Sequence, residues 1–340
     1  MNSSAKGDAE QPCLAARFVD GPHVSAPDQA EQRLADWLTD LASEQAAAIN
    51  DVIGRFSRAR TILLGIADAS PYLFDLVRVD AARLIRLLGC QPEPHLAGLI
   101  DKTRREVSAA SSEADVMQLL RRLKSEAALL IALADIGGVW PVLRVTAALT
   151  ELAIASVQSA LRNVLRQEAA RGRLKPPDPD CPEKNSGLVV LAMGKMGAGE
   201  LNFSSDIDLI VFFDSAAPSL APDIEPQPFF VRVTQALARL LQQRTCDGYV
   251  FRVDLRLRPD PASTQVAISI DSALHYYERE GRTWERAAMI KARPCAGDAG
   301  TGEALLADLA PFVWRKHLDF AALADVHDMK RQMQTYRGQS

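Results

Sequence analysis

The first half of the chain repeats its apolar residues at helical spacing. Between residues 28 and 173 they recur every three or four positions, as in Leu34, Trp37, Leu38 and Leu41. This spacing places them on one face of an α-helix. We therefore predict an all-helical domain over residues 28–173.

Two breaks divide the predicted helical domain. Ser70 can cap a helix, and Pro71 suits the first turn that follows it. A second break is expected at Gly89-Cys90-Gln91-Pro92. A longer interruption, from Arg171 to Asn185, is rich in proline and charge and cannot continue a helix or a strand. We place a linker and the domain boundary at residues 174–186.

Beyond the linker, short apolar runs alternate with a helical pattern. Residues 188–193 and 206–213 are predicted strands, and residues 229–241 a helix with one apolar face. After a turn at Asp247-Gly248, apolar residues alternate from Tyr249 to Leu257 and predict another strand. Its other face carries four charged residues, namely Arg252, Asp254, Arg256 and Arg258. The whole pattern predicts an α+β protein, with an α/β domain over residues 187–340.

Length and charge narrow the class of protein. The chain has 340 residues, which leaves room for two domains, and a formal net charge of -4. An acidic balance argues against nucleic acid as the main partner. The five cysteines are scattered without a Cys-x-x-Cys pair, so the sequence suggests neither a zinc site nor a disulfide framework. We expect a protein of the reducing cytoplasm.

Neither a secretory signal nor a membrane span is predicted. Residues 1–27 mix charge, proline and small residues without a continuous apolar core, which indicates a flexible leader. The most apolar stretch, residues 127–157, is interrupted by Asp135, Pro141, Arg144 and Glu151. We expect that stretch to form buried helix.

Two aspartates one residue apart stand in the strand predicted over residues 206–213. Side chains at i and i+2 of a strand share a face, so Asp206 and Asp208 would stand side by side. Neighbouring carboxylates repel unless a cation or a proton intervenes, and hard oxygen ligands suit Mg²⁺ or Mn²⁺. Such pairs also occur in turns and on solvated faces. With Asp254 on a later strand, three carboxylates could converge on a metal site for phosphoryl or nucleotidyl transfer.

A glycine-rich turn precedes the aspartate pair. Gly194, Gly197 and Gly199 match neither the Walker pattern nor the dinucleotide fingerprint. The turn could hold phosphate with its backbone N–H groups and with the hydroxyls of Ser204 and Ser205. It could also be a tight turn that merely needs glycine.

Guanidinium groups are further candidates for phosphate contact, because their fork matches phosphate oxygens. Among Arg252, Arg256 and Arg258 we favour Arg256. A later run, Trp284-Glu285-Arg286 with Lys291 and Arg293, could close a nucleotide pocket. A buried tryptophan with an accompanying ion pair would explain that run nearly as well.

Together these segments resemble a known family. Gly194-Lys195, the later Asp206-Ile207-Asp208 and a third aspartate are similar to nucleotidyltransferases of the DNA polymerase beta type. Three blocks within residues 187–294 resemble the glutamine synthetase adenylyltransferase/deadenylylase family more closely. They read GKMGAGELNFSSDIDL, YVFRVDLRLRP and GRTWERAAMIKARP. The first block resembles the N-terminal, adenylyl-removing half of that tandem enzyme.

The resemblance implies a fold, a reaction and a set of residues. The fold would be a polymerase-beta-like domain with a mixed sheet and C-terminal helices after the helical domain. Inorganic phosphate would attack the adenylylated tyrosine of glutamine synthetase and release ADP. Asp206, Asp208 and Asp254 would ligate Mg²⁺ or Mn²⁺ and act in catalysis. Nucleotide and phosphate would be held by Gly194, Lys195, Ser205 and Arg256.

Alternatives follow from the same resemblance. The reaction could run as AMP transfer from ATP to the tyrosine, or the chain could be a non-catalytic module that binds glutamine synthetase. The full-length family protein would also meet a PII-type signalling protein. The family continues well beyond Ser340, where this chain stops in a predicted helix near residues 328–333. We therefore expect the domain over residues 187–340 to be truncated at its C-terminal end.

Overall fold

The computed structural model describes residues 12–314 and residue 331. The chain forms two compact units, each of which is described by itself. One contains residues 1–103 and 122–149, and the other contains residues 104–121 and 150–340. The predicted helix near residues 328–333 lies almost wholly outside the described residues.

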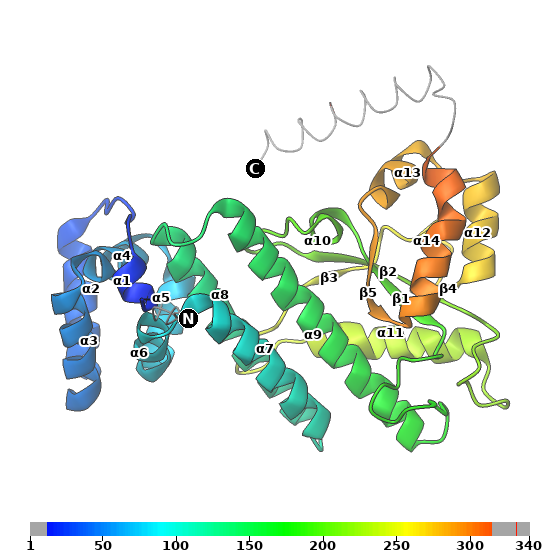
Figure 1. Ribbon diagram of the computed structural model, residues 1–340, viewed down its shortest axis with the longest axis horizontal. Coiled ribbons are helices and arrows are strands. Elements are labelled where there is room, and N and C mark those ends of the chain that lie inside the picture. Colours follow the sequence, from blue (N-terminus) through cyan, green and yellow to red (C-terminus); the bar gives the residue numbers. More distant parts are fainter. Residues whose placement is uncertain (1–11, 315–330, 332–340) are drawn as a thin grey trace, which may run out of the picture. The chain divides into compact units, whose positions relative to one another are not determined.

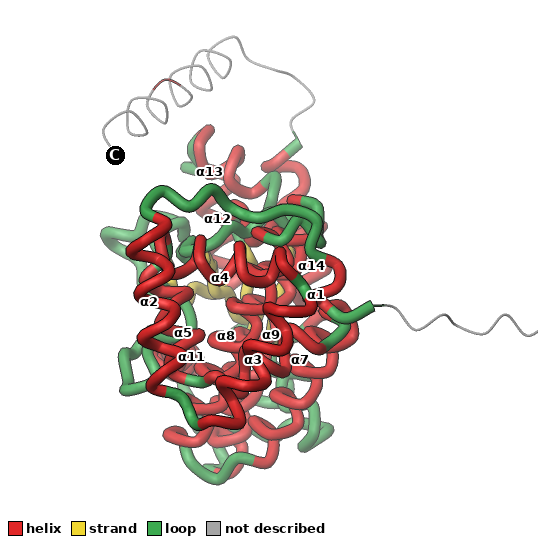
Figure 2. The backbone as a smooth tube through the Cα atoms, turned by 90° about the vertical axis from the view of Figure 1, so that its left-hand side faces the viewer, coloured by secondary structure: helices red, strands yellow, loops and turns green. Residues whose placement is uncertain are grey.

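The regular structure of the first unit is helical throughout its described residues (Figure 2). Its helices are α1 (Leu14–Arg17), α2 (Pro27–Asp40), α3 (Ser43–Arg55), α4 (Ser57–Ala69), α5 (Pro71–Val79) and α6 (Ala81–Gly89), with parts of α7 (Pro92–Ala109), α8 (Glu113–Ile136) and α9 (Val142–Ala170). Both predicted breaks are present. The hydroxyl of Ser70 accepts a 3.4 Å hydrogen bond from the N–H of Leu73, and α7 begins at Pro92.

Part of the predicted flexible leader is packed. Leu14 and Ala15 of α1 are buried, and so is Phe18. The ring of Phe18 lies against Gly137, where an added Cβ would come within 2.2 Å of it. The flexible-leader prediction is therefore wrong for this stretch, because these few apolar side chains find a core although polar residues surround them in the sequence. Residues 1–11 lie outside the described residues.

The division into units does not follow the predicted boundary at residues 174–186. The later turns of α9 and the adjoining ends of α7 and α8 belong to the second unit. There the guanidinium of Arg121 is buried and donates to the carbonyls of Leu240, Gly248 and Gln243. The proline-rich segment has no helix or strand and also packs in this unit, where the N–H of Lys175 donates to the carbonyl of Ser219 at 2.6 Å. Helical periodicity cannot show at which residue a long helix passes from one core to another.

The second unit is built on a mixed sheet (Figure 1). Its elements are β1 (Leu188–Ala192), α10 (Gly194–Ala198), β2 (Ile207–Phe213), α11 (Pro226–Gln242), β3 (Val253–Asp254), β4 (Ala267–Ser269), α12 (Ile270–Arg279), α13 (Thr283–Met289), β5 (Arg293–Gly297) and α14 (Ala299–Val313). The strand order is β3-β2-β1-β5, and β4 also pairs with β2. The pairs β1–β2 and β1–β5 are antiparallel, whereas β3 and β4 run parallel to β2. The predicted α+β fold with a mixed sheet and following helices is confirmed.

Helices pack on both faces of this sheet, and this packing holds β2 and β3 in place. On one face Val189, Leu191 and Phe212 pack in a core with Tyr277, Leu305 and Phe312 from the helices α12 and α14. On the other face the ring of Phe213 stacks on Phe230 of α11, with centroids 4.7 Å apart. Buried strands of this kind have near-continuous apolar sequences, as β1 and β2 do.

The strand predicted over residues 249–258 is much shorter in the structure. Only Val253 and Asp254 pair with β2, and residues 255–264 form turns. Val250 and Phe251 are buried without being in a strand, since their N–H groups donate to the carbonyl of Leu241 at the end of α11. The alternation of apolar residues from Tyr249 to Leu257 therefore came from the burial of individual side chains, and not from a long strand paired with β2.

Candidate functional site

The glycine-rich turn is α10, a short helix that directly follows β1. Gly194 has a φ of 54°, and a Cβ placed there would lie 2.8 Å from Oδ2 of Asp208. At Gly197 a Cβ would lie 2.1 Å from the carbonyl oxygen of Lys291 and 2.5 Å from that of Ala192. Both glycines are required by these close approaches, so the need for glycine in a tight turn is real. The same approach brings the turn against the carboxylate of Asp208.

The three predicted acids come from neighbouring positions of the sheet. Asp208 of β2 and Asp254 of β3 are partners in register across two parallel strands. Asp206 precedes β2 by one residue and is exposed. Burial raises the pKa of Asp208, and repulsion from the carboxylates of Asp254 and Asp206 raises it further. Asp208 is therefore the member of the trio that feels the charge of both other carboxylates.

Two arginines neutralise the outer members of this trio. The guanidinium of Arg252 pairs with the carboxylate of Asp206. Arg256 pairs with Asp254 at 2.6 Å, and its backbone N–H also donates to that carboxylate at 2.8 Å. The hydrogen bond from the Arg256 side chain is the main reason why the pKa of Asp254 is lowered. Asp208 is left as the crowded member, because the two guanidinium groups bind its neighbours.

The arrangement bears directly on metal binding. Among residues 12–314 and 331, no group of three or more His, Cys, Asp or Glu side chains is placed so that it could hold a metal ion. The carboxylates of Asp206 and Asp254 are turned to Arg252 and Arg256 instead. The chemistry of the three side chains suits a hard divalent cation, because carboxylate oxygens are its preferred ligands, although their present placement does not form a ligand set.

Lys195 and Ser205 are joined by a residue that the sequence reasoning missed. The side-chain oxygen of Asn202 accepts hydrogen bonds from Nζ of Lys195, at 2.8 Å, and from the hydroxyl of Ser205. Two residues after Asn202, Ser204 has a φ of 57°, and its carbonyl accepts a 2.8 Å hydrogen bond from Arg252. The sequence offered little signal for this role, since Asn202 and Ser205 lie in a loop and Lys195 lies in α10.

Arg258 does not share the polar face predicted for it. Its guanidinium donates to the carbonyls of Leu255, Pro261 and Thr264 at 2.7–3.2 Å. Burial lowers its pKa, which is consistent with a position inside the turn. Because the strand ends after Asp254, the alternation that would have placed Arg258 beside it is lost.

The later run of residues supports the turn and the neighbouring helices. Glu285 is buried and accepts hydrogen bonds from the N–H of Arg282 and the hydroxyl of Tyr276, whereas Trp284 is half-buried. Lys291 pairs with Glu200 at 3.2 Å, and Arg293 donates to the carbonyl of Met196. The alternative of a buried tryptophan is therefore not what the structure shows, since the buried charged group of this block is the carboxylate of Glu285.

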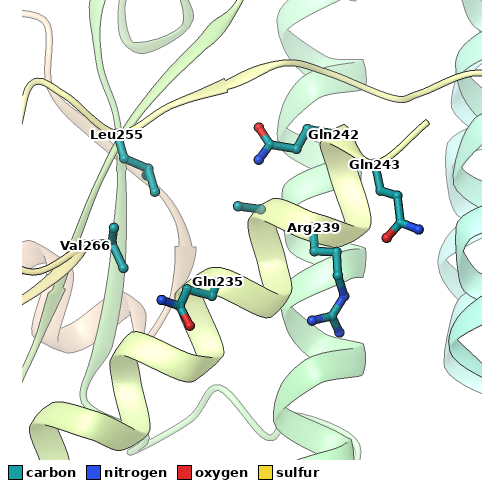
Figure 3. A pocket seen from close by; sticks show the side chains of 7 residues that line it. Gln235, Arg239, Gln242, Gln243, Leu255 and Val266 are labelled. Atoms are coloured by element: carbon teal, nitrogen blue, oxygen red, sulfur yellow. The ribbon is translucent and has the colours of Figure 1, made fainter.

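A separate cavity of about 350 Å³ lies beside α11 (Figure 3). It is lined by Gln235, Ala238, Arg239, Gln242, Gln243, Leu255 and Val266. None of the predicted site residues lines it. The candidate site is therefore the set of acids and the turn at the edge of the sheet rather than this cavity.

The chain is similar to proteins of one known family. A family model described as Glutamate-ammonia ligase adenylyltransferase matches residues 61–308. The chain is 74% identical, over its whole length, to a protein of Bradyrhizobium sp. (strain ORS 278) named bifunctional glutamine synthetase adenylyltransferase/adenylyl-removing enzyme. Proteins with the same name in Bradyrhizobium diazoefficiens and Xanthobacter autotrophicus are 70% identical over 100% of the chain and 52% identical over 97% of it.

The matches cover only part of each relative. The chain spans about a third of their length, 34% for the two Bradyrhizobium proteins and 33% for the Xanthobacter protein. In the described part of the chain, no helix combines the length and the apolar content needed to cross a bilayer. With three quarters of its positions identical to one such relative and most of its length matched by the family model, this chain belongs to the glutamate-ammonia ligase adenylyltransferase family.

Proposed function

We propose that this chain carries a metal-dependent nucleotidyltransferase site that controls glutamine synthetase, and that its reaction is phosphorolytic removal of AMP from adenylyl-tyrosine. The observation that carries the proposal is the pairing of Asp208 with Asp254 across two parallel strands, with Asp206 beside them and Gly194 against Asp208. The names of the relatives support it, since they join adenylyl transfer and adenylyl removal to glutamine synthetase.

Asp206, Asp208 and Asp254 would hold Mg²⁺ or Mn²⁺. The positions of Arg252 and Arg256 support this assignment, because they show that these carboxylates already attract cationic groups. When bound, such an ion would neutralise the repulsion at Asp208 and stabilise the negative charge of a reacting phosphoryl group. The two arginines would then be released from the carboxylates.

The chain's own groups would position the reactants. An oxygen of inorganic phosphate would form a bond to the α-phosphorus of the AMP ester, and the bond from phosphorus to the tyrosyl oxygen would break. The products are ADP and tyrosine, whose oxygen takes up a proton. Lys195 and Arg256 would hold the negatively charged oxygens, together with Ser205 and the backbone of Gly194.

The opposite reaction is the second candidate, since the relatives' name includes both activities. In that case the tyrosyl oxygen would attack the α-phosphorus of ATP, and pyrophosphate would leave. The same carboxylates and cationic groups would serve either direction. The identity of the second product separates the two reactions.

The test supplies adenylylated glutamine synthetase with phosphate, and the unmodified enzyme with ATP. We expect ADP to form in the first mixture. Asp206→Asn should lower its rate on the order of 10³-fold, because removing one carboxylate leaves the metal site incomplete. Asp223→Asn is the matched control, since it removes an exposed carboxylate of the same unit and should leave the rate unchanged.

Three other results would contradict the proposed function. Pyrophosphate from the second mixture without ADP from the first would favour transfer over removal. Retained binding of glutamine synthetase without product in either mixture would identify a non-catalytic binding module. A fully active Asp206→Asn variant with an unchanged unfolding midpoint would show that the site is elsewhere.

A further inference from the structure

A buried arginine, Arg121, lies at the C-terminal end of α11. Of the lysines and arginines among the described residues, it is the one that is buried, with an exposed fraction of 1%. It comes from α8, whose first turns belong to the second unit. Arginine stays charged in proteins, and burying a charge is costly unless hydrogen bonds compensate it. The proposed reaction makes no direct use of this group, so its burial needs another explanation.

Backbone carbonyls compensate the charge of Arg121. Its Nε donates to the carbonyl of Gly248 at 3.0 Å, and its Nη2 donates to that of Gln243. Its Nη1 donates to the carbonyls of Leu240, at 3.2 Å, and of Met117, at 2.9 Å. Leu240 and Gln243 lie at the end of α11, where helical carbonyls lack partners and the helix dipole favours a cation. The guanidinium therefore caps α11 and joins its end to the turn at Gly248.

The chain after Gly248 is attached to the same end of α11. The N–H groups of Val250 and Phe251 donate to the carbonyl of Leu241 at 2.9 and 3.1 Å, and both side chains are buried. Leu241 lies between the two residues of α11 whose carbonyls accept from Arg121. The guanidinium and the segment after Gly248 therefore depend on one short stretch of backbone.

This segment continues directly into β3, which carries Asp254. The N–H of Ile207 donates to the carbonyl of Arg252 at 3.0 Å, and two residues later Asp254 pairs in register with Asp208 of β2. Since β3 has only two residues, it contributes few hydrogen bonds of its own. The position of Asp254 therefore depends on the segment that precedes it.

We propose that Arg121 is a positioning residue for the site, and that it holds Asp254 beside Asp208 through the end of α11 and residues 248–253. This inference rests on the proposed function, because it requires Asp254 to act as a metal ligand. Arg121 acts through the backbone, since its hydrogen bonds are to carbonyls. A misplacement of about 1 Å in a catalytic group can cost on the order of 10²-fold in rate, so such an anchor can matter without touching the reactants.

The first test compares Arg121→Met with Arg239→Met. Methionine donates no hydrogen bond, so Arg121→Met removes the cap of α11. Arg239→Met is the matched control, because Arg239 pairs with Glu113 at 2.9 Å and joins the same two helices at the surface. We expect Arg121→Met to lower kcat for phosphorolysis on the order of 10²-fold, with KM for adenylylated glutamine synthetase unchanged. The affinity for Mn²⁺, measured by electron paramagnetic resonance, should fall about tenfold, and the control should change none of these quantities.

Hydrogen exchange separates positioning from general stability. In Arg121→Met, well below its unfolding midpoint, the amides of residues 248–254 should exchange faster, because the end of α11 to which they are attached has lost its cap. The amides of β1 and β2 should keep their protection. An equal increase in exchange throughout the second unit would show that Arg121 only stabilises that unit, and would overturn the proposal.

A more conservative variant decides the matter if Arg121→Met does not fold. Arg121→Lys keeps a positive charge, but its single ammonium group cannot reach the carbonyls that the guanidinium fork joins. We expect kcat to fall about tenfold, with faster exchange confined to residues 248–254. Original values of kcat, Mn²⁺ affinity and exchange in this variant would overturn the proposal.

The remaining outcomes distinguish this inference from the function on which it rests. If the unaltered chain forms ADP from adenylylated glutamine synthetase and a folded Arg121→Met variant keeps its turnover and Mn²⁺ affinity, only the positioning role is refuted. If the unaltered chain forms neither ADP nor pyrophosphate in the two mixtures above, the proposed function itself is refuted. The exchange comparison needs no turnover, so it still tests whether Arg121 anchors residues 248–254.

Discussion

Each unit contains a partly buried carboxylate whose pKa is shifted, and the two shifts have opposite directions. In the helical unit Glu93 receives two hydrogen bonds from Arg17, at 2.7 and 2.8 Å, and one from the indole of Trp140 at 2.7 Å. The bond from Arg17 is the main cause that lowers the pKa of Glu93 to about 2. In the α/β unit burial raises the pKa of Asp208, and the charges of Asp254 and Asp206 raise it further.

The difference separates a stabilising ion pair from a binding site. Glu93 has all its partners within the fold, so its charge strengthens the native state. Asp208 lies where burial and two like charges disfavour its charge, and only an added cation or a proton would relieve this. Carboxylates kept in such an unfavourable position are typical of sites that bind or react.

Asp208→Asn should produce the largest effect. We expect turnover to fall on the order of 10³-fold or more, because the central carboxylate of the proposed metal site is lost. The unfolding midpoint should stay the same or rise, since a neutral side chain removes the repulsion from Asp254 and Asp206. Turnover assays and thermal unfolding measure the two effects. If the variant folded and kept full turnover, Asp208 would not differ in function from a structural carboxylate such as Glu93.

Arg256→Gln should change metal binding in the opposite direction from nucleotide binding. Without the guanidinium, the carboxylate of Asp254 keeps only the backbone N–H of residue 256 as a donor, and the affinity for Mn²⁺ should rise several-fold. The affinity for ADP should fall about tenfold, since a charged hydrogen bond to phosphate is lost. Electron paramagnetic resonance of free Mn²⁺ and calorimetry measure the two affinities. Arg239→Gln, which breaks a surface pair with Glu113, is the control, and weaker Mn²⁺ binding in Arg256→Gln would contradict the prediction.

Glu93→Gln should produce the smallest effect, and it should be confined to stability. We expect a loss of about 1 kcal/mol in the free energy of unfolding at pH 7, a value kept low because the pair is partly exposed and screened by solvent. Turnover should not change. Urea titration measures the loss.

The pH dependence of the Glu93 contribution follows from the lowered pKa. A carboxyl whose folded pKa lies below its unfolded value stabilises the protein above the unfolded value, near 4.5, and this contribution disappears as the pH falls toward about 2. The difference in stability between the original chain and Glu93→Gln should therefore shrink over that interval. A difference that grew with acidification would show that Glu93 is not held by Arg17.

Much of the fold could be predicted from local pattern. The start of α5 at Pro71, the strands β1 and β2, and the helix α11 were visible because each depends on its own residues. The short strand β3 and the packing of Leu14 could not be predicted in the same way. Both depend on contacts with segments far away in the sequence, which an alternation of apolar residues does not report.

The sequence could indicate which residues of the candidate site lie near one another, but it could not indicate their hydrogen-bond partners. The sequence placed Asp206 and Asp208 near Asp254, and the structure pairs Asp208 with Asp254 across β2 and β3. The pairing of each outer carboxylate with its own arginine, and the role of Asn202, were not predicted. Side-chain partners depend on loop geometry, and because β3 ends after Asp254 the guanidinium of Arg258 donates to backbone carbonyls of the turn.

The contact between Gly197 and the carbonyl of Lys291 has a consequence for biosynthesis. A growing chain has made all three aspartates well before it reaches β5, yet the backing of the glycine turn emerges from the ribosome only with residues 291–293. A nascent polypeptide would thus contain the three aspartates before it contains residues 291–293, which support the glycine-rich turn. The site would be assembled only when β5 joins the sheet.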